Sequence, residues 1–94
     1  IDESLLPVAK PVRAACELLG FDPLFVANEG CAALFIPPES AESTLAVLRR
    51  HPVTAQARAI GTVDTAGGHV SARTALGTVR RLMPPSGEQL PRIC

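Results

Sequence analysis

The sequence has no tryptophan and no tyrosine, and its only aromatic residues are three phenylalanines. Nucleic-acid-binding surfaces often stack bases on aromatic side chains, so such a platform is not expected here. Net charge is also absent, because nine Lys and Arg residues balance nine Asp and Glu residues. A neutral chain has no general attraction for polyanions. We therefore expect neither nucleic acid nor a membrane surface among its partners.

Long apolar runs and paired cysteines are missing as well. The longest apolar run, residues 31–36, is far too short to cross a bilayer. Residues 1–3 show no basic region leading into an apolar core, so no signal peptide is predicted. The cysteines at 16, 31 and 94 are odd in number, and their spacing fits neither a zinc motif nor a disulfide framework. This usage indicates a reducing, cytoplasmic setting.

Signals for phosphate loops, metal sites and catalytic triads are also lacking. Gly61, Gly67 and Gly68 do not have the spacing of a phosphate-binding loop, and a hairpin turn accounts for the last two. His51 and His69 have no partner at metal-ligand spacing, so no metal site is predicted. No Ser-His-Asp arrangement can be argued from the pattern.

Two helices are marked by their start and stop signals. The first runs over residues 11–20, with proline at its first position and glycine as its cap. Cys16 lies on its apolar stripe, which predicts a buried thiol. The second begins at Pro38 and ends before residues 51–52, with acidic residues in its first turn and arginines in its last.

Extended segments fill the remainder of the chain. The turn 28–30 carries Asn and Gly, which predicts a hairpin between its flanking segments. The predicted strands are 24–27, 32–36, 57–63 and 69–74, while Gly77 leaves the segment 76–83 undecided. This order predicts an α+β fold, a mainly antiparallel four-stranded sheet with two helices on one face. With 94 residues the chain is one small domain.

The C-terminal end predicts an arm. Proline at 84 and 85 and glycine at 87 favour an extended, flexible segment 84–94 after a domain of residues 1–83. The arm ends at Cys94, whose α-carboxylate disfavours a thiolate while Arg92 favours it. On residue type alone, Cys94 is either a carrier thiol or an accident of sequence. Glu29, in a tight turn, is likewise either a solvent-exposed surface residue without a function or a site residue.

Two blocks of sequence carry a resemblance to a known family. Residues 87–94, Gly-Glu-Gln-Leu-Pro-Arg-Ile-Cys, resemble the C-terminus of the HypE family of hydrogenase maturation proteins. Residues 16–24, followed by 26–30, resemble the segment of that family that leads to its Ala-Asn-Glu-Gly turn. The order of elements is similar to the later part of the C-terminal domain of AIR synthetase and its relatives. Residues 74–78 lack a Gly-Gly pair expected in that family, and residues 83–86 are richer in proline than usual.

The resemblance implies a function for the terminal cysteine. In the family, HypF loads a carbamoyl group onto that sulfur, and ATP-dependent dehydration converts it into a thiocyanate. The cyanide then passes through the HypC–HypD complex to the iron of a [NiFe] hydrogenase. When these roles are assigned to the matching residues of this sequence, the resemblance implies that Cys94 is the covalent carrier and Glu29 the proton acceptor. Asn28 would orient the carboxamide, and Arg92 would pair with phosphate or anchor the arm.

The same resemblance implies that the chain is a fragment. The ATP and Mg²⁺ ligands are expected mainly in a preceding domain, which also forms dimers in the family. Apolar surface at Phe25 or Phe35 would then be left uncovered, which predicts self-association. Two other functions stay open: a non-catalytic docking module for hydrogenase assembly factors, and an AIR synthetase-superfamily domain with another substrate. The terminal cysteine argues against the last of these.

Overall fold

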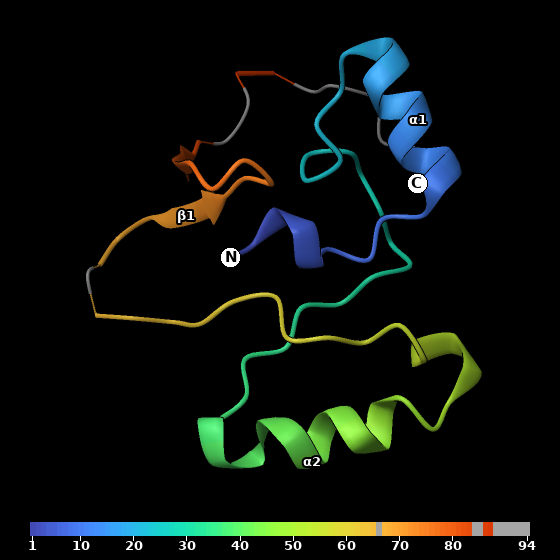
Figure 1. The fold of residues 1–94 in the computed structure, drawn as a ribbon, viewed down its shortest axis with the longest axis vertical. Helices are drawn as coiled ribbons and strands as arrows, with labels where there is room; N and C mark the ends of the chain where they lie inside the picture. Colours follow the sequence, from blue (N-terminus) through green and yellow to red (C-terminus); the bar gives the residue numbers. More distant parts are fainter. Residues whose placement is uncertain (66, 84–85, 88–94) are drawn as a thin grey trace. The chain divides into compact units, whose positions relative to one another are not determined.

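A computed structural model describes residues 1–65, 67–83 and 86–87. The chain divides into two compact units. The first joins Ile1–Pro7 to Leu34–Leu82, and the second is built around Val8–Ala33. Figure 1 follows the chain through both, with helix α1 in the second unit and helix α2 and strand β1 in the first.

Helix α1, Lys10–Leu19, dominates the second unit. It begins with a proline in its first turn, which suits the position because that amide has no partner inside the helix. It ends at Gly20, whose left-handed φ of 71° only glycine adopts without strain. Cys16 is 5% exposed. The helix predicted at 11–20 and the buried thiol on its apolar stripe are therefore confirmed.

The loop after α1 differs from the prediction. No strand occurs between α1 and α2, so the predicted hairpin of 24–27 with 32–36 is wrong. The predicted turn relied on the tolerance of asparagine and glycine for positive φ. Neither Asn28 nor Gly30 adopts it. Instead the side chain of Asn28 binds the Gly30 amide, a local hydrogen bond that competes with strand pairing.

Helix α2, Pro38–Leu48, lies in the first unit and confirms the second predicted helix. The arginines predicted in its last turn, Arg49 and Arg50, lie beyond its end instead, with Arg49 as the C-cap. Pro38 occupies its first turn, and Glu39 complements the positive end of the helix dipole. The 3₁₀ turn η2, Pro52–Thr54, follows its end. There the hydroxyl of Thr54 donates to the Leu48 carbonyl at 2.6 Å, which satisfies one of the last open acceptors of the helix.

The only sheet among the described residues has two strands. Strand β1, Val70–Arg73, pairs antiparallel with β2, Val79–Leu82, from Val70 opposite Leu82 to Arg73 opposite Val79. The turn between them uses Gly77 at φ 84°. The predicted strand 69–74 is confirmed, and the undecided segment 76–83 contains the second strand. The predicted four-stranded sheet is wrong.

The N-terminal residues line the free edge of β1. The backbone nitrogen of Ile1 donates to the Ser71 carbonyl at 2.7 Å, and the Arg73 amide donates to the Ile1 carbonyl at 2.9 Å. Asp2 forms a parallel bridge with Arg73, and its amide donates to the Ile60 carbonyl at 2.8 Å. The short 3₁₀ turn η1, Glu3–Leu5, follows. These bonds cover an edge that would otherwise be open.

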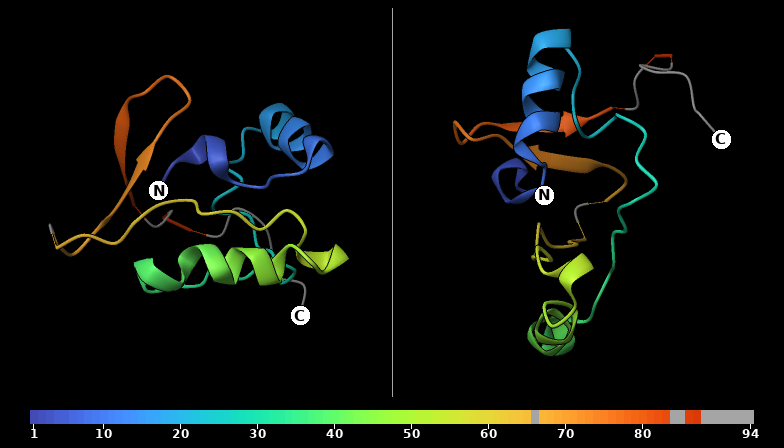
Figure 2. Two further views of the ribbon diagram at one scale, coloured as in Figure 1. Left: turned by 60° about the horizontal axis from the view of Figure 1, so that its bottom comes forward. Right: turned by 90° about the vertical axis from the view of Figure 1, so that its right-hand side faces the viewer.

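The segment 57–63 is not a strand, so that prediction is also wrong. Figures 1 and 2 show it running between the N-terminal residues and α2. It makes one backbone hydrogen bond, at Ile60, to the N-terminal residues, and the guanidinium of Arg49 binds the Ala57 carbonyl at 2.8 Å. A β-strand requires a series of backbone hydrogen bonds to a neighbouring strand, and a single backbone bond at Ile60 does not form one.

The described residues contain no helix both long and apolar enough to cross a membrane. The division into a domain of 1–83 and an arm of 84–94 stays a prediction, because most of that arm lies outside the described residues.

Candidate functional site

Two of the four predicted site residues lie in the described part of the chain. Asn28 and Glu29 belong to the loop that follows α1 in the second unit. Cys94 and Arg92 lie outside the described residues. The geometry of the site is therefore that of the loop 28–31.

Asn28 holds this loop together through both atoms of its side-chain amide. Its Oδ1 accepts a hydrogen bond from the Gly30 amide at 2.8 Å. Its Nδ2 donates to the sulfur of Cys31 at 3.3 Å. Asparagine forms such turns readily because its short side chain reaches its own backbone two residues on. The result is a small loop with a fixed amide at its first position.

Glu29 lies inside that loop and is exposed. None of the described residues forms a hydrogen bond or ion pair with its carboxylate. An ionised carboxylate has only acceptor positions, and no donor from the described part of the chain occupies those of Glu29. A proton acceptor must reach the proton that it removes, so an unencumbered carboxylate on an exposed loop is suited to that task.

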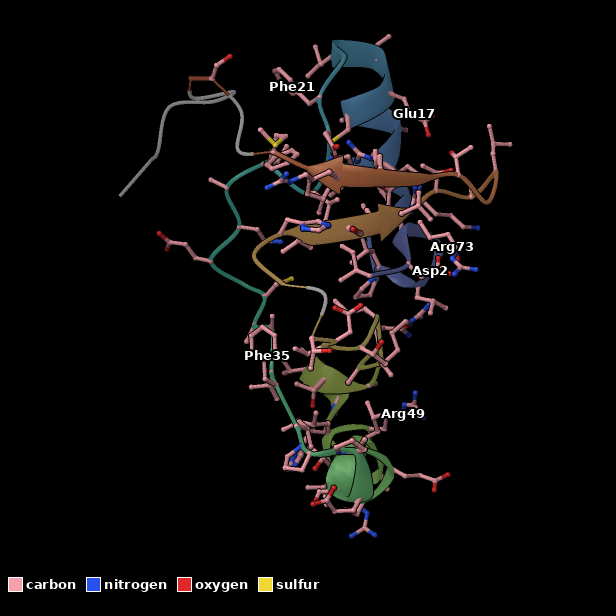
Figure 3. All side chains as sticks on the ribbon, turned by 90° about the vertical axis from the view of Figure 1, so that its left-hand side faces the viewer. Asp2, Glu17, Phe21, Phe35, Arg49 and Arg73 are labelled. Atoms are coloured by element: carbon pink, nitrogen blue, oxygen red, sulfur yellow. The ribbon has the colours of Figure 1, made fainter. Side chains whose placement is uncertain are left out.

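The charged groups of the first unit serve its structure. The guanidinium of Arg80 binds one carboxylate oxygen of Glu3 at 2.7 and 2.8 Å, which ties β2 to the N-terminal turn. The hydroxyl and the amide of Ser4 both donate to the Asp2 carboxylate, and these bonds lower the pKa of Asp2 below its ordinary value of 3.8. Figure 3 labels Asp2 beside Arg73, where the N-terminal turn meets β1.

The described residues do not fit a magnesium or nucleotide site. Within this part of the chain no three His, Cys, Asp or Glu side chains gather as metal ligands. His69 contacts only the Gly67 carbonyl of its own turn, at 3.2 Å from Nδ1, and His51 precedes η2. Mg²⁺ bound with ATP is usually held by carboxylates and a phosphate loop. The described residues supply neither.

Cys31 is the residue that sequence reasoning missed. It is exposed and carries a free thiol, and the sequence pattern predicted no role for it. Its contact with Asn28 depends on a tight loop that brings the third residue along back to the first. The Asn-x-Gly pattern of residues 28–30 was the one available signal for that loop.

Comparison with known families identifies the chain. Residues 1–86 match the C-terminal domain of AIR synthase related proteins, so the chain belongs to that family. Among curated relatives it matches proteins named carbamoyl dehydratase HypE. It is 50% identical to the one from Cupriavidus necator over its entire length, and 51% identical to the one from Azotobacter vinelandii over 98% of its length. The chain spans 27% of the length of each relative.

Solved structures give the same relationship. A structure of E. coli HypE, a hydrogenase maturation protein, has a TM-score of 0.90 and 45% identity, covering all of this chain and 29% of that one. A HypE structure in complex with ATP has a TM-score of 0.81 and 39% identity over 95% of this chain and 29% of that one. A HypE–HypF complex has a TM-score of 0.83 and 35% identity over 90% of this chain and 28% of that one.

Proposed function

We propose that the chain is the C-terminal part of a HypE-type carbamoyl dehydratase that acts in [NiFe] hydrogenase maturation. The observation that carries this proposal is the match with proteins of that name over the whole chain, at 50% identity. The residues Pro91, Arg92, Ile93 and Cys94 add support, because they resemble a motif of that family.

In this proposal Cys94 is the carrier. Its thiolate attacks the activated carbonyl of a carbamoyl group delivered by HypF, and a thioester-like S–CO–NH₂ forms as the activating group leaves. A HypE–HypF complex has been solved for relatives, which supports HypF as the donor. The product cyanide would go to the HypC–HypD complex. Such chemistry on a free thiol suits the cytoplasm.

Dehydration of the carbamoyl group removes its oxygen and both nitrogen-bound protons. The oxygen takes a phosphoryl group from ATP, because hydroxide itself is a poor leaving group. One proton leaves the nitrogen, the C–O bond then breaks with phosphate departing, and loss of the second proton gives S–C≡N. Glu29 is the proposed acceptor of a proton, and its open, exposed carboxylate supports that role. Asn28 would orient the carboxamide, and Arg92 would pair with phosphate.

The ATP site is proposed to lie mainly in the part of the protein that precedes this chain. The described residues do not fit Mg²⁺ or a nucleotide, whereas a relative's structure is described as a complex with ATP. By itself the chain is proposed to be inactive.

Self-association is a further part of the proposal, with a second copy of the chain as the occupant. Phe35 is 83% exposed and Leu34 59%, whereas Phe25 is partly buried. Figure 3 shows Phe35 on the extended segment before α2. No described residue accepts a hydrogen bond from the backbone amides of 34–36. An apolar segment with an unpaired backbone favours strand addition by an identical, equally uncharged segment.

The decisive experiment uses the full-length protein with HypF, ATP and a carbamoyl donor, followed by intact mass spectrometry. Cys94→Ser should show no adduct, because an alcohol is too weak a nucleophile at its ordinary pKa. Glu29→Gln should accept the carbamoyl group and retain it, because removal of a general base slows proton transfer by about 10²–10⁴-fold. Glu17→Gln, the same change at an exposed position of α1, is the matched control and should react normally.

Normal conversion to thiocyanate by Glu29→Gln would show that Glu29 is only a loop residue. Loading of Cys94→Ser at the normal rate would show that the carrier sulfur lies elsewhere.

A further inference from the structure

The hydrogen bonds of Asn28 decide which way its amide faces. The Gly30 amide can only donate, so the Asn28 atom at 2.8 Å from it must be the oxygen. The amide nitrogen then lies on the opposite side, 3.3 Å from the sulfur of Cys31, which accepts one of its two hydrogens. Reversal of the amide would set the NH₂ group against the Gly30 N–H, donor against donor. Cys31 therefore holds the orientation that the Gly30 amide selects.

This arrangement leaves a defined set of open groups. Among the described residues, neither the second N–H of Asn28 nor the carboxylate of the neighbouring Glu29 has a partner. A primary carboxamide presents the complementary set, with an oxygen that accepts and an NH₂ that donates. One donor and one acceptor on adjacent residues match that pair of groups.

We propose that Cys31 is a positioning residue: its sulfur fixes the Asn28 amide so that the remaining N–H binds the oxygen of an S-linked carboxamide whose N–H groups are accepted by Glu29. The inference rests on the proposed function, and it names the substrate group and the direction of each hydrogen bond. Cys31 acts through Asn28 and takes no part in proton transfer or in carrying the carbamoyl group.

The first test measures the amide itself, in the chain as it stands. The side-chain N–H of Asn28 that faces the sulfur should have a proton chemical shift displaced from that of a solvent-exposed asparagine amide in a ¹⁵N correlation spectrum, because only this N–H is bound to sulfur. Cys31→Ala should move the side-chain amide shifts of Asn28 toward the solvent-exposed values, and Cys31→Ser, which keeps an acceptor, should largely restore them. Ala32→Ser, at the next exposed position, is the control and should leave them unchanged. Unchanged shifts in Cys31→Ala would overturn the proposal.

The second test measures a single turnover in the full-length protein. Cys31→Ala should load carbamoyl normally but dehydrate it about two- to tenfold more slowly, the effect of one neutral hydrogen bond. Cys31→Ser should recover most of the rate. An unchanged dehydration rate in Cys31→Ala, beside a stalled Glu29→Gln, would overturn the positioning role and leave the proposed function intact. If Glu29→Gln dehydrates normally, the proposed function of the site fails, while the spectrum of Asn28 still reports the contact with Cys31.

Discussion

Replacing Gly61 with alanine should destabilise the first unit, because the backbone of Ile1 occupies the space of the added methyl group. A Cβ built on Gly61 lies 2.8 Å from Cα of Ile1, 3.2 Å from its nitrogen and 3.2 Å from its Cγ2. Gly61 has no positive φ, so steric contact alone, and no backbone strain, decides the effect. The closest atom belongs to the backbone, so no side-chain rotation can relieve the contact.

The size of the effect follows from the distance. Carbon atoms pack best at about 3.5–4.0 Å, so the two segments must separate by at least about 0.7 Å. The adjoining hydrogen bond from the Asp2 amide to the Ile60 carbonyl is 2.8 Å long and would be stretched beyond a favourable length. Overpacking of this kind costs about 1–3 kcal/mol. Alanine also restricts the unfolded chain, which offsets about 0.4–1 kcal/mol. The net loss should be about 1–2 kcal/mol.

Urea unfolding followed by circular dichroism measures this loss as a lower midpoint with an unchanged slope. In a thermal scan the same change should lower Tm by about 4–8 °C for each kcal/mol. Gly30→Ala is the matched control. It also lacks a positive φ, but its nearest neighbour, the side-chain oxygen of Asn28 at 3.3 Å, has to shift by only a few tenths of an ångström. Ile1→Ala should not rescue Gly61→Ala, because it leaves the 2.8 Å contact in place. Equal midpoints for Gly61→Ala and the wild type would refute the close approach.

Three other outcomes are expected. Asp2→Asn should lower the free energy of unfolding at neutral pH but not well below pH 3.8, because the Ser4 hydroxyl, the main cause of the lowered pKa of Asp2, stabilises the fold only while the carboxyl is ionised. Urea unfolding of the wild type and the variant at both pH values measures this difference, and a difference that persists in acid would contradict the expectation. The purified chain should not hydrolyse ATP in a phosphate-release assay, and turnover free of contaminants would show a more local active site. Phe35→Ser should shift the mass found by light scattering from dimer to monomer, whereas Val53→Ser, at a still more exposed position of the first unit, should not. A wild-type chain that is monomeric at every concentration would count against self-association.

Both helices could be predicted from the sequence because their limits are set locally. Proline at the start of α1 and α2, and Gly20 at the end of α1, act on the residues beside them. The buried position of Cys16 follows from helical spacing in the same way. The loop at Asn28 and Glu29 was singled out by its residues, since asparagine and glycine favour a tight turn. The family of the chain was indicated by short sequence motifs, which can be recognised without knowledge of any tertiary contact.

The strands, by contrast, were decided by partners distant in the sequence. Residues 32–36 and 57–63 have the composition of strands, yet the two strands found among the described residues are β1 and β2. The free edge of β1 is taken by Ile1, through hydrogen bonds that join residues about seventy positions apart. The contact of Cys31 with Asn28 is local, but it exists only because the loop did not open into a hairpin. The composition of a segment indicates that it is able to form a strand. Only the tertiary structure decides which backbone N–H groups pair with which backbone carbonyls.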